Sequence, residues 1–277
     1  MSVRGLLEQR GLRPKKSFGQ NFLTDGNILE AIAVACVPDS AMGNASVVEF
    51  GAGTGALTAA LAKRARHVIA VERDRDLVPI LESQFANSVR VIEGDAQTEP
   101  LAPLFEGATG LRVLAGNLPY QLTGRLLQRA VEHAHLFDRA VFMVQLEVAD
   151  RLLALPDSKA YGALTIFVQA AFNTRLVTKV SPHCFYPPPD VHSAVVSFDK
   201  LSPPRAAETP LFRQLVRGAF GARRKTLRNA WKRLAAVETL EAAASEAGIS
   251  LQARGETLSV EQFAAMANAL VTRLGEM

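Results

Sequence analysis

Short apolar segments alternate with helical patterns through the first ~200 residues of the chain, and most of these segments end in polar side chains. Strands that are apolar along their whole length belong to parallel sheets covered by helices on both faces. In such sheets, ligands bind beyond the carboxyl ends of the strands. We therefore predict an α/β fold with a site at that edge. The expected strands are 46–50, 67–72, 89–95, 111–117, 139–145, 163–169 and 191–198, and the expected helices between them are 24–36, 55–65, 74–85 and 122–134.

Helical periodicity gives further detail at the start of the chain. In the segment 24–36, Ile28, Ile32 and Cys36 fall on one helical face. Asn27 and Glu30 stand at the spacing of a capping box. We therefore expect Asn27 to cap the start of this helix.

A proline-rich stretch at 199–210 marks a change in composition and reads as a linker. Beyond it the pattern is helical, with almost no strand signal. We therefore predict two domains, a Rossmann-like domain over 1–200 and a small all-helical domain over 201–277. The expected helices of the second domain are 211–220, 225–237, 240–248 and 259–274.

The composition is that of a globular protein with a sizeable core, because 48% of the 277 residues are hydrophobic and 21% are charged. The longest apolar run, 31–37, is far shorter than the ~20 residues that cross a bilayer. We expect no contact with a membrane and no secretory leader. Cys36 and Cys184 lie far apart, without a CxxC partner, which favours a reducing cytoplasm over a disulfide framework or a zinc site.

Positive charge is concentrated in two places, although the net charge is only +4. Residues 1–16 carry five basic side chains against one acid, and residues 212–234 carry eight without any acid. Such clusters are typical of proteins that bind polyanions. The alternative is a solvated helix face. The absence of interleaved acids favours nucleic acid.

Three glycines, Gly51, Gly53 and Gly55, follow the strand 46–50 and precede a helix. Glycine lets a backbone turn tightly and approach a ligand closely. The dinucleotide motif is G-x-G-x-x-G, and here the third glycine comes one position earlier. Glu72 ends the next strand and suits ribose hydroxyls, while Asp95 ends the third strand and suits an adenine amine. Either acid could instead cap a neighbouring helix, but together the features favour a nucleoside cofactor.

The fourth strand leads into Asn117, Leu118, Pro119 and Tyr120. The exocyclic amine of adenine is a poor nucleophile, because its lone pair is delocalised into the ring. Acceptors from the Asn117 side chain and the Leu118 carbonyl would favour a more tetrahedral nitrogen, and Pro119 fixes the local backbone. Tyr120 offers a ring for stacking, worth roughly 1–3 kcal/mol per base, against the cost of base flipping. The motif indicates methylation of an adenine amine.

The motifs together resemble the KsgA (RsmA) family of ribosomal RNA adenine dimethyltransferases along nearly the whole chain. The matching strings are KKSFGQNFLTD (15–25), VVEFGAGTGALT (47–58), AVERDRDL (70–77), EGDAQ (93–97), GNLPY (116–120), SKAYGALTIFVQ (158–169), CFYPPPDVHSAVV (184–196), RRKTLRNAWK (223–232) and RGETLSVEQF (254–263). Ala52, His192 and Ala222 depart from residues common in the family.

This resemblance implies an S-adenosylmethionine-dependent enzyme that dimethylates N6 of two adjacent adenosines near the 3′ end of 16S rRNA in a nearly assembled small ribosomal subunit. It implies that Phe185 stacks on the second face of the target base, and that the helical domain recognises rRNA. We expect a monomer that binds neither metal nor DNA. The implied cofactor residues are Gln20, Asn21, Leu23, Gly51, Gly53, Gly55, Glu72, Asp95, Ala96 and Asn117, and the implied RNA-binding residues are Arg223, Arg224, Lys225 and Arg228.

Other functions remain open at this stage. An Erm-type methyltransferase of large-subunit rRNA shares the fold and a similar Asn-x-Pro-Tyr motif, whereas DNA adenine methyltransferases usually carry Asp-Pro-Pro-Tyr. A ribosome-assembly factor that has lost catalysis is a second alternative, and the intact Asn117 and Glu72 argue against it. An NAD-linked oxidoreductase is a third, disfavoured by the glycine spacing and by the lack of an acid–base pair for hydride transfer.

Overall fold

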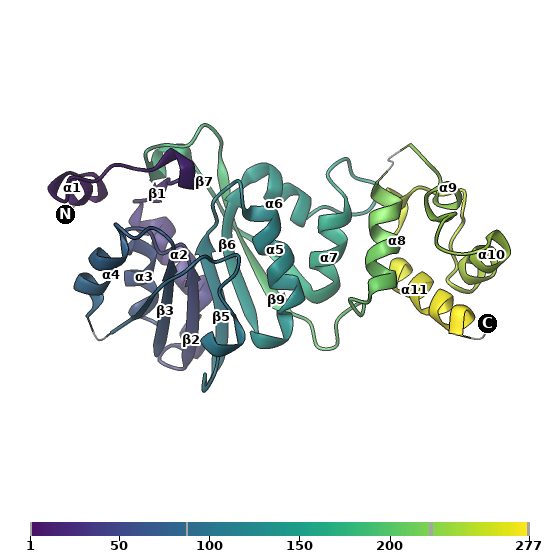
Figure 1. Cartoon of the computed structure of the whole chain (residues 1–277), viewed down its shortest axis with the longest axis horizontal. Coiled ribbons are helices and arrows are strands. Elements are labelled where there is room, and N and C mark those ends of the chain that lie inside the picture. The colour runs from purple at the N-terminus through teal and green to yellow at the C-terminus, as the bar shows by residue number, and fades with distance from the viewer. Residues whose placement is uncertain (1, 87, 222–223, 276–277) are drawn as a thin grey trace. The chain divides into compact units, whose positions relative to one another are not determined.

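The computed structural model describes residues 2–86, 88–221 and 224–275, and the chain packs as two units (Figure 1). The first comprises Met1–Ala149 with Thr174–Lys200, and the second comprises Asp150–Asn173 with Leu201–Met277. The structure thus has a boundary between the two units after Lys200, which is the single domain boundary that we predicted. The difference lies in residues 150–173. We expected them in the first domain, but Tyr161 and Ile166 are buried in the core of the second unit.

Among the described residues, seven strands form the sheet of the first unit in the order β4-β3-β2-β5-β6-β9-β7. The pairs β2–β3, β2–β5, β3–β4 and β5–β6 are parallel, and β9 runs antiparallel to β6. The expected α/β class is confirmed. The bounds are β2 (Ala45–Phe50), β3 (His67–Glu72), β4 (Arg90–Glu93), β5 (Leu111–Asn117), β6 (Arg139–Gln145), β7 (Phe172–Val180) and β9 (Ser193–Lys200).

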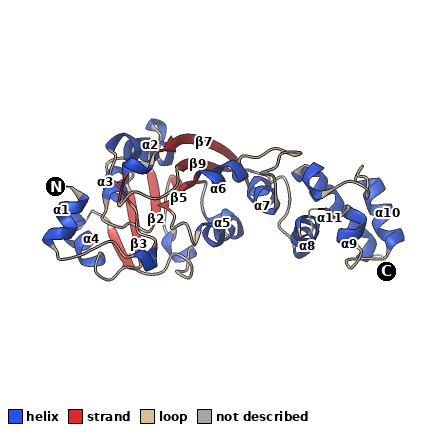
Figure 2. Ribbon diagram, turned by 90° about the horizontal axis from the view of Figure 1, so that it is seen from above, coloured by secondary structure: helices blue, strands red, loops and turns tan. Residues whose placement is uncertain are grey.

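Helices cover both faces of this sheet, with α2 and α3 on one side and α5 on the other (Figure 2). Ile32 and Cys36 of α2 are fully buried against the strands, as their spacing predicts. The expected cap was wrong, because Asp25 caps α2 by accepting the N–H groups of Asn27 and Ile28. The bounds are α1 (Val3–Gln9), α2 (Gly26–Cys36), α3 (Ala56–Ala62), α4 (Val78–Phe85), α5 (Thr123–Glu132) and α6 (Leu146–Leu152).

The segment 163–169 is a helix, α7 (Ala163–Ala171), and not the strand that we expected. A short apolar run fits a buried strand and a buried helix equally well. The Thr165 hydroxyl favours the helix locally, since it accepts the Gly162 N–H (3.1 Å) and donates to the Arg151 carbonyl (2.7 Å). The strand that follows, β7, was missed. It lies at the sheet edge, and its mostly exposed polar residues hide the strand signal.

The second unit is built from α7, α8 (Pro210–Phe220), α9 (Leu227–Trp231), α10 (Val237–Glu246) and α11 (Val260–Gly275). The expected helical character of the C-terminal segment is confirmed. Phe212, Trp231 and Phe263 are fully buried at its centre. Across the described part of the chain, none of the helices combines the length and the apolarity needed to traverse a bilayer.

Trp231 provides a test of this packing, because its indole N–H donates to the buried Leu215 carbonyl at 2.8 Å. We expect Trp231→Ala to lower the free energy of unfolding by about 3–5 kcal/mol, through the cavity that it leaves. Chemical denaturation followed by circular dichroism measures the change. The control Leu155→Ala removes a side chain that is 71% exposed. Its free energy of unfolding should therefore stay within about 0.5 kcal/mol of that of the parent. A similar loss in both variants would contradict the prediction.

Candidate active site

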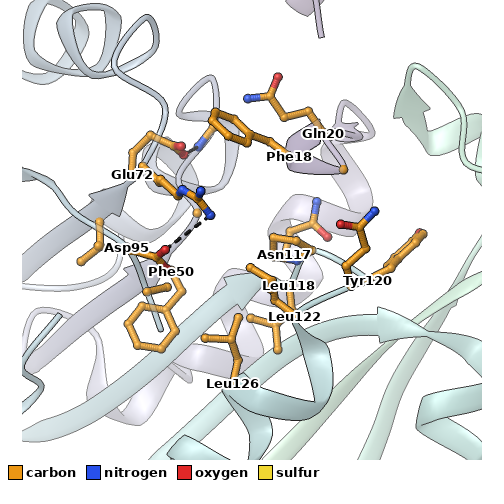
Figure 3. Close-up of a pocket in the computed structure, with 18 of the residues that line it drawn as sticks. Phe18, Gln20, Phe50, Glu72, Asp95, Asn117, Leu118, Tyr120, Leu122 and Leu126 are labelled. Carbon is orange, nitrogen blue, oxygen red and sulfur yellow. Dashed lines mark hydrogen bonds and ion pairs between the residues drawn. The ribbon is translucent and has the colours of Figure 1, made fainter. Parts of the chain in front are cut away.

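A pocket of about 170 Å³ opens at the carboxyl ends of the central strands (Figure 3). Phe50 ends β2 and Gly51 follows it, Glu72 ends β3, and Asn117 ends β5. These ends lie side by side because the parallel register pairs Phe50 with both Val71 and Gly116. The pocket therefore has the position expected for ligands in a sheet of this type.

The glycine loop follows β2 in a conformation that few other residues adopt. Gly51 and Gly53 have φ values of 71° and 60°. A Cβ on Gly53 would lie 3.1 Å from the Phe22 ring, so a side chain there would require the ring to shift as well as a strained backbone. Both glycines line the pocket, as predicted.

Gly55 has a different position from the one that we expected. It is the N-cap of α3, with φ of 82°, and it is not among the residues that line the pocket. A Cβ there would come within 2.7 Å of the Phe85 ring. The packing of α3 against α4 is thus a structural reason for this glycine, and its role as a cofactor residue stays a prediction.

Glu72 is 7% exposed and holds the loops around it. One carboxylate oxygen accepts the Gly53 N–H at 2.7 Å, and the other accepts the Asp74 N–H at 2.8 Å. Burial raises the pKa of Glu72, while these hydrogen bonds oppose the rise. Each carboxylate oxygen can accept a further hydrogen bond. The side chain can thus brace the glycine loop and still receive a ribose hydroxyl from the pocket.

Asp95 and Ala96 lie in the loop after β4, which ends at Glu93, and both line the pocket. Asp95 accepts the Gln97 N–H at 2.9 Å and forms an ion pair with Arg73 at 3.4 Å. The Arg73 guanidinium also lies 5.0 Å from the centre of the Phe18 ring. An adenine amine would have to share Asp95 with this arginine.

Asn117 has an orientation set by the N-terminal segment. Its Nδ2 donates to the Asn21 backbone carbonyl at 3.0 Å. An amide has a donor end and an acceptor end, so this bond leaves Oδ1 as the atom that can accept from a substrate amine. Leu118 is buried and donates its N–H to the Met143 carbonyl at 3.1 Å. Leu118 and Pro119 both line the pocket, as predicted.

Tyr120 lies at the mouth of the pocket, where it also lines a second, open cavity. Its hydroxyl is hydrogen-bonded to Ser193 Oγ at 2.8 Å. Burial raises the pKa of this phenol, and the bond to Ser193 opposes the rise. The hydroxyl is engaged by Ser193, which leaves the ring as the surface available to a base.

The N-terminal segment 15–21 is attached to the loop after β3 through Asp74. Lys15 Nζ contacts Asp74 at 2.5 Å and Asp76 at 2.6 Å, and Gln20 Nε2 donates to Asp74 at 2.7 Å. Asp74 is only 2% exposed. Burial raises its pKa, but the bonds from Lys15 and Gln20 outweigh this and lower it. This network, which we call the Asp74 clamp, places Gln20 and Asn21 in the pocket wall.

Leu23 and Phe185 do not line the pocket, although the sequence predicted them for the site. They face each other in a two-stranded pairing between β1 (Phe22–Leu23) and β8 (Phe185–Tyr186). Both are 5% exposed and pack in the core of the first unit. Side chains alternate along a strand, so the neighbours Phe22 and Tyr186 point the other way. Phe22 lines the pocket and Tyr186 lines the second cavity.

Several pocket residues were not predicted as site residues. The apolar ones are Phe18, Phe22, Phe50, Val71, Leu122 and Leu126, and the polar one of most interest is Arg73. Phe18, Phe50, Leu122 and Leu126 are labelled in Figure 3. Phe18 and Phe22 belong to the string 15–25, and Arg73 follows Glu72 directly. The sequence offered one signal for these residues, which is that they stand next to predicted site residues. Sequence position alone does not tell which of these neighbours faces the pocket.

Of the predicted RNA-binding residues, Arg224 and Lys225 precede α9 and Arg228 lies within it. Arg224 and Lys225 are exposed, and Arg228 is exposed and forms an ion pair with Glu241 at 3.1 Å. Arg223, like the family departure Ala222, lies outside the described residues.

The sheet and its pocket define an α/β enzyme of the Rossmann-like methyltransferase class. A family model described as ribosomal RNA adenine dimethylase matches residues 11–272, and the chain belongs to this family. A Myxococcus xanthus protein named ribosomal RNA small subunit methyltransferase A is 43% identical over 274 residues, which cover 97% of this chain and 95% of the relative.

Two solved structures have the same fold at 25% identity. The crystal structure of a dimethyladenosine transferase from Plasmodium falciparum has a TM-score of 0.73 and covers 92% of this chain and 98% of that chain. The crystal structure of the 23S rRNA methyltransferase ErmE has a TM-score of 0.68 and covers 91% of this chain and 100% of that chain. The family, the Rossmann-like fold and the enzyme class, an rRNA adenine dimethyltransferase, are thereby confirmed.

The Asp74 clamp yields a prediction that needs no ligand. Asp74→Asn removes the charge that holds Lys15 and Gln20, so amide exchange over residues 16–21 should accelerate about tenfold, for a loss of ~1.4 kcal/mol in local stability. Hydrogen–deuterium exchange with mass spectrometry measures this. Because the folded pKa of Asp74 is lowered, the clamp persists at neutral pH and is lost only as the pH falls through that pKa.

Asp76→Asn is the matched control, because Asp76 binds the same lysine but is half exposed. An exposed ion pair contributes little, so the exchange of residues 16–21 should change less than twofold. Equal acceleration in the two variants would contradict a special role for Asp74.

Proposed function

We propose that this protein uses S-adenosylmethionine to dimethylate N6 of two adjacent adenosines in the 3′-terminal hairpin of 16S rRNA, late in the assembly of the small ribosomal subunit. The observation that carries the proposal is the orientation of Asn117. Its Nδ2 is bound to the Asn21 carbonyl, so Oδ1 is left to accept from an amine at a pocket that Tyr120 also lines.

The residues around the pocket fit the nucleoside part of the cofactor. Glu72 can accept the ribose hydroxyls, Asp95 can accept an adenine amine, and the apolar side chains of Phe50 and Leu126 can contact the adenine ring. Gln20 and Asn21 are available to the methionine end. The cofactor supplies an electrophilic methyl group, which the protein must hold in line with the attacking nitrogen.

The protein prepares that nitrogen by hydrogen bonding. Asn117 Oδ1 and the Leu118 carbonyl accept the two hydrogens of the adenine amine, which favours a tetrahedral nitrogen with its lone pair free for attack. Tyr120 stacks on the base and offsets part of the cost of flipping it out of the RNA. The amine becomes acidic as it is alkylated, so its proton passes to water and no strong base is required.

We base the proposed RNA substrate on the similarity to named relatives and on the exposed basic residues of the second unit. A named small-subunit methyltransferase is 43% identical to this chain, whereas the large-subunit enzyme ErmE is 25% identical. We propose the small subunit as the partner, the exposed basic residues at the start of α9 as part of its binding surface, and the cytoplasm as the place of action. Modification of large-subunit rRNA is the second candidate, since the fold of ErmE is shared along its whole length.

Incubation with labelled S-adenosylmethionine and small subunits that lack the modification tests the proposal. Label should appear on two adjacent adenosines near the 3′ end of 16S rRNA. Label in large-subunit rRNA alone would favour the Erm-type activity. Binding of the particle without any label would point to an assembly factor.

Asn117→Ala should lower kcat for methyl transfer by about 10²–10³-fold or more, because it removes an acceptor aimed at the reacting group. The variant should still bind S-adenosylmethionine, as Glu72 and Asp95 remain. Calorimetry and the labelling assay give the two quantities. The control Asn27→Ala changes an exposed asparagine of α2 and should match the parent. Full activity in Asn117→Ala would refute the assigned role.

Neutralising Arg224 and Lys225 to glutamine should weaken particle binding and flatten its dependence on salt. Each lost phosphate contact reduces the slope of log K against log salt by about 0.7–0.9. Filter binding at several salt concentrations measures the slope. Lys159→Gln with Arg254→Gln removes two other exposed charges of the second unit and should leave it unchanged. The same slope in both double variants would count against the proposed surface.

A further inference from the structure

An open cavity of about 1,060 Å³ adjoins the pocket on the far side of Tyr120. The two share Tyr120 and the segment Gly19–Asn21 as lining residues. The rest of the cavity is lined by eight residues of the segment 4–16, by Gln145 at the end of β6, and by residues 186–191. It therefore begins where the target base would be held and is larger than a single base requires.

Two cations of the cavity lining are placed to contact phosphates. Arg4 is paired with Glu8 at 2.8 Å, so that pair adds no net charge. Arg13 and Lys16 are exposed cations in the lining, and Asp190 is the remaining acid there. Lys15, between them in sequence, is instead engaged by the Asp74 clamp. The clamp thus fixes the backbone from which Arg13 and Lys16 extend.

Tyr186 gives the cavity an aromatic wall. It is partly buried, packs against the cluster that contains Leu7 and Phe22, and lines the cavity together with Tyr120. Its pairing with Phe22 in the β1–β8 ladder fixes its backbone. Three prolines follow it, Pro187 to Pro189, so this wall has little backbone freedom to lose when a ligand binds.

We propose that this cavity is the binding site for the single-stranded RNA that flanks the target adenosine, with phosphates at Arg13 and Lys16 and a neighbouring base on Tyr186. Cations that position a backbone beside an aromatic stacking surface are the usual arrangement for single-stranded RNA. The inference rests on the proposed function and extends it, because it assigns the RNA next to the target base to Arg13, Lys16 and Tyr186, which the proposed function does not use.

The test measures kcat and KM of the full-length enzyme for small subunits that lack the modification, with labelled S-adenosylmethionine. Arg13→Gln with Lys16→Gln should raise KM about tenfold at moderate salt and leave kcat unchanged. The slope of log KM against log salt should fall by roughly 1.4, for two phosphate contacts on a single strand. The matched control, Lys63→Gln with Arg66→Gln, removes two exposed charges beside the amino-terminal end of β3 and should leave KM and the slope unchanged.

Tyr186 is tested separately, because its ring also packs against Leu7. Tyr186→Leu keeps apolar packing but removes the ring, and it should raise KM about tenfold. Tyr186→Phe keeps the ring and should restore KM to within about twofold. The affinity for S-adenosylmethionine, measured by calorimetry, should be unchanged in all these variants, which separates RNA contact from a scaffolding role for the N-terminal segment.

Three results would overturn the inference. The first is a basic double variant whose KM and salt slope match those of Lys63→Gln with Arg66→Gln. The second is a Tyr186→Phe variant as impaired as Tyr186→Leu. The third is a loss of cofactor affinity that accounts for the whole rise in KM. The parent enzyme reports on the proposed function independently, because labelling of subunits by the parent does not depend on any of these substitutions.

Discussion

The hydrogen bond from the Asn117 side chain to the Asn21 carbonyl joins two parts of the chain that are 96 residues apart. It decides which atom of the amide faces the pocket, since only one end of an amide can donate. The bond requires that the N-terminal segment lie against the end of β5, and Asp74 holds the segment there through Lys15 and Gln20. The chemistry at β5 thus depends on an acid that follows β3.

Acids around the pocket organise its loops before any ligand binds. Glu72 accepts the N–H groups of Gly53 and Asp74, so it ties the glycine loop to the clamp. Glu49 lies buried in β2, where burial raises its pKa to about 7 and the Thr58 hydroxyl donates to it at 2.6 Å. Buried acids are costly unless they are hydrogen-bonded. Here their bonds fix the positions of Gly53, the start of α3 and the loop after β3, which is the preorganisation that a binding site needs.

The sequence predicted the strands 67–72, 111–117 and 139–145 to the residue, because full burial between two layers of helices leaves a continuous apolar run with polar ends. It predicted the pocket for the same reason, as parallel strands bring their polar ends together. The sequence did not predict α7, because a buried helix and a buried strand have the same apolar run. It did not predict β7, because this edge strand is rich in polar residues. It also could not tell which of Phe22 and Leu23 faces the pocket, or which of Phe185 and Tyr186 faces the second cavity. The direction of each side chain there follows from the β1–β8 register, which a motif does not encode.

Tyr120 and the segment Gly19–Asn21 form a partition with the pocket on one side and the open cavity on the other. Methyl transfer in line requires that the donor and the acceptor approach the methyl group from opposite directions, and Asn117 lines the pocket beside this shared wall. The wall also links the two ligands physically. A cofactor that further stabilises Gly19–Asn21 stabilises a wall of the second cavity as well, and coupling between two binding sites is reciprocal. A ligand of the cavity that stabilises the same wall must then favour the cofactor by an equal free energy.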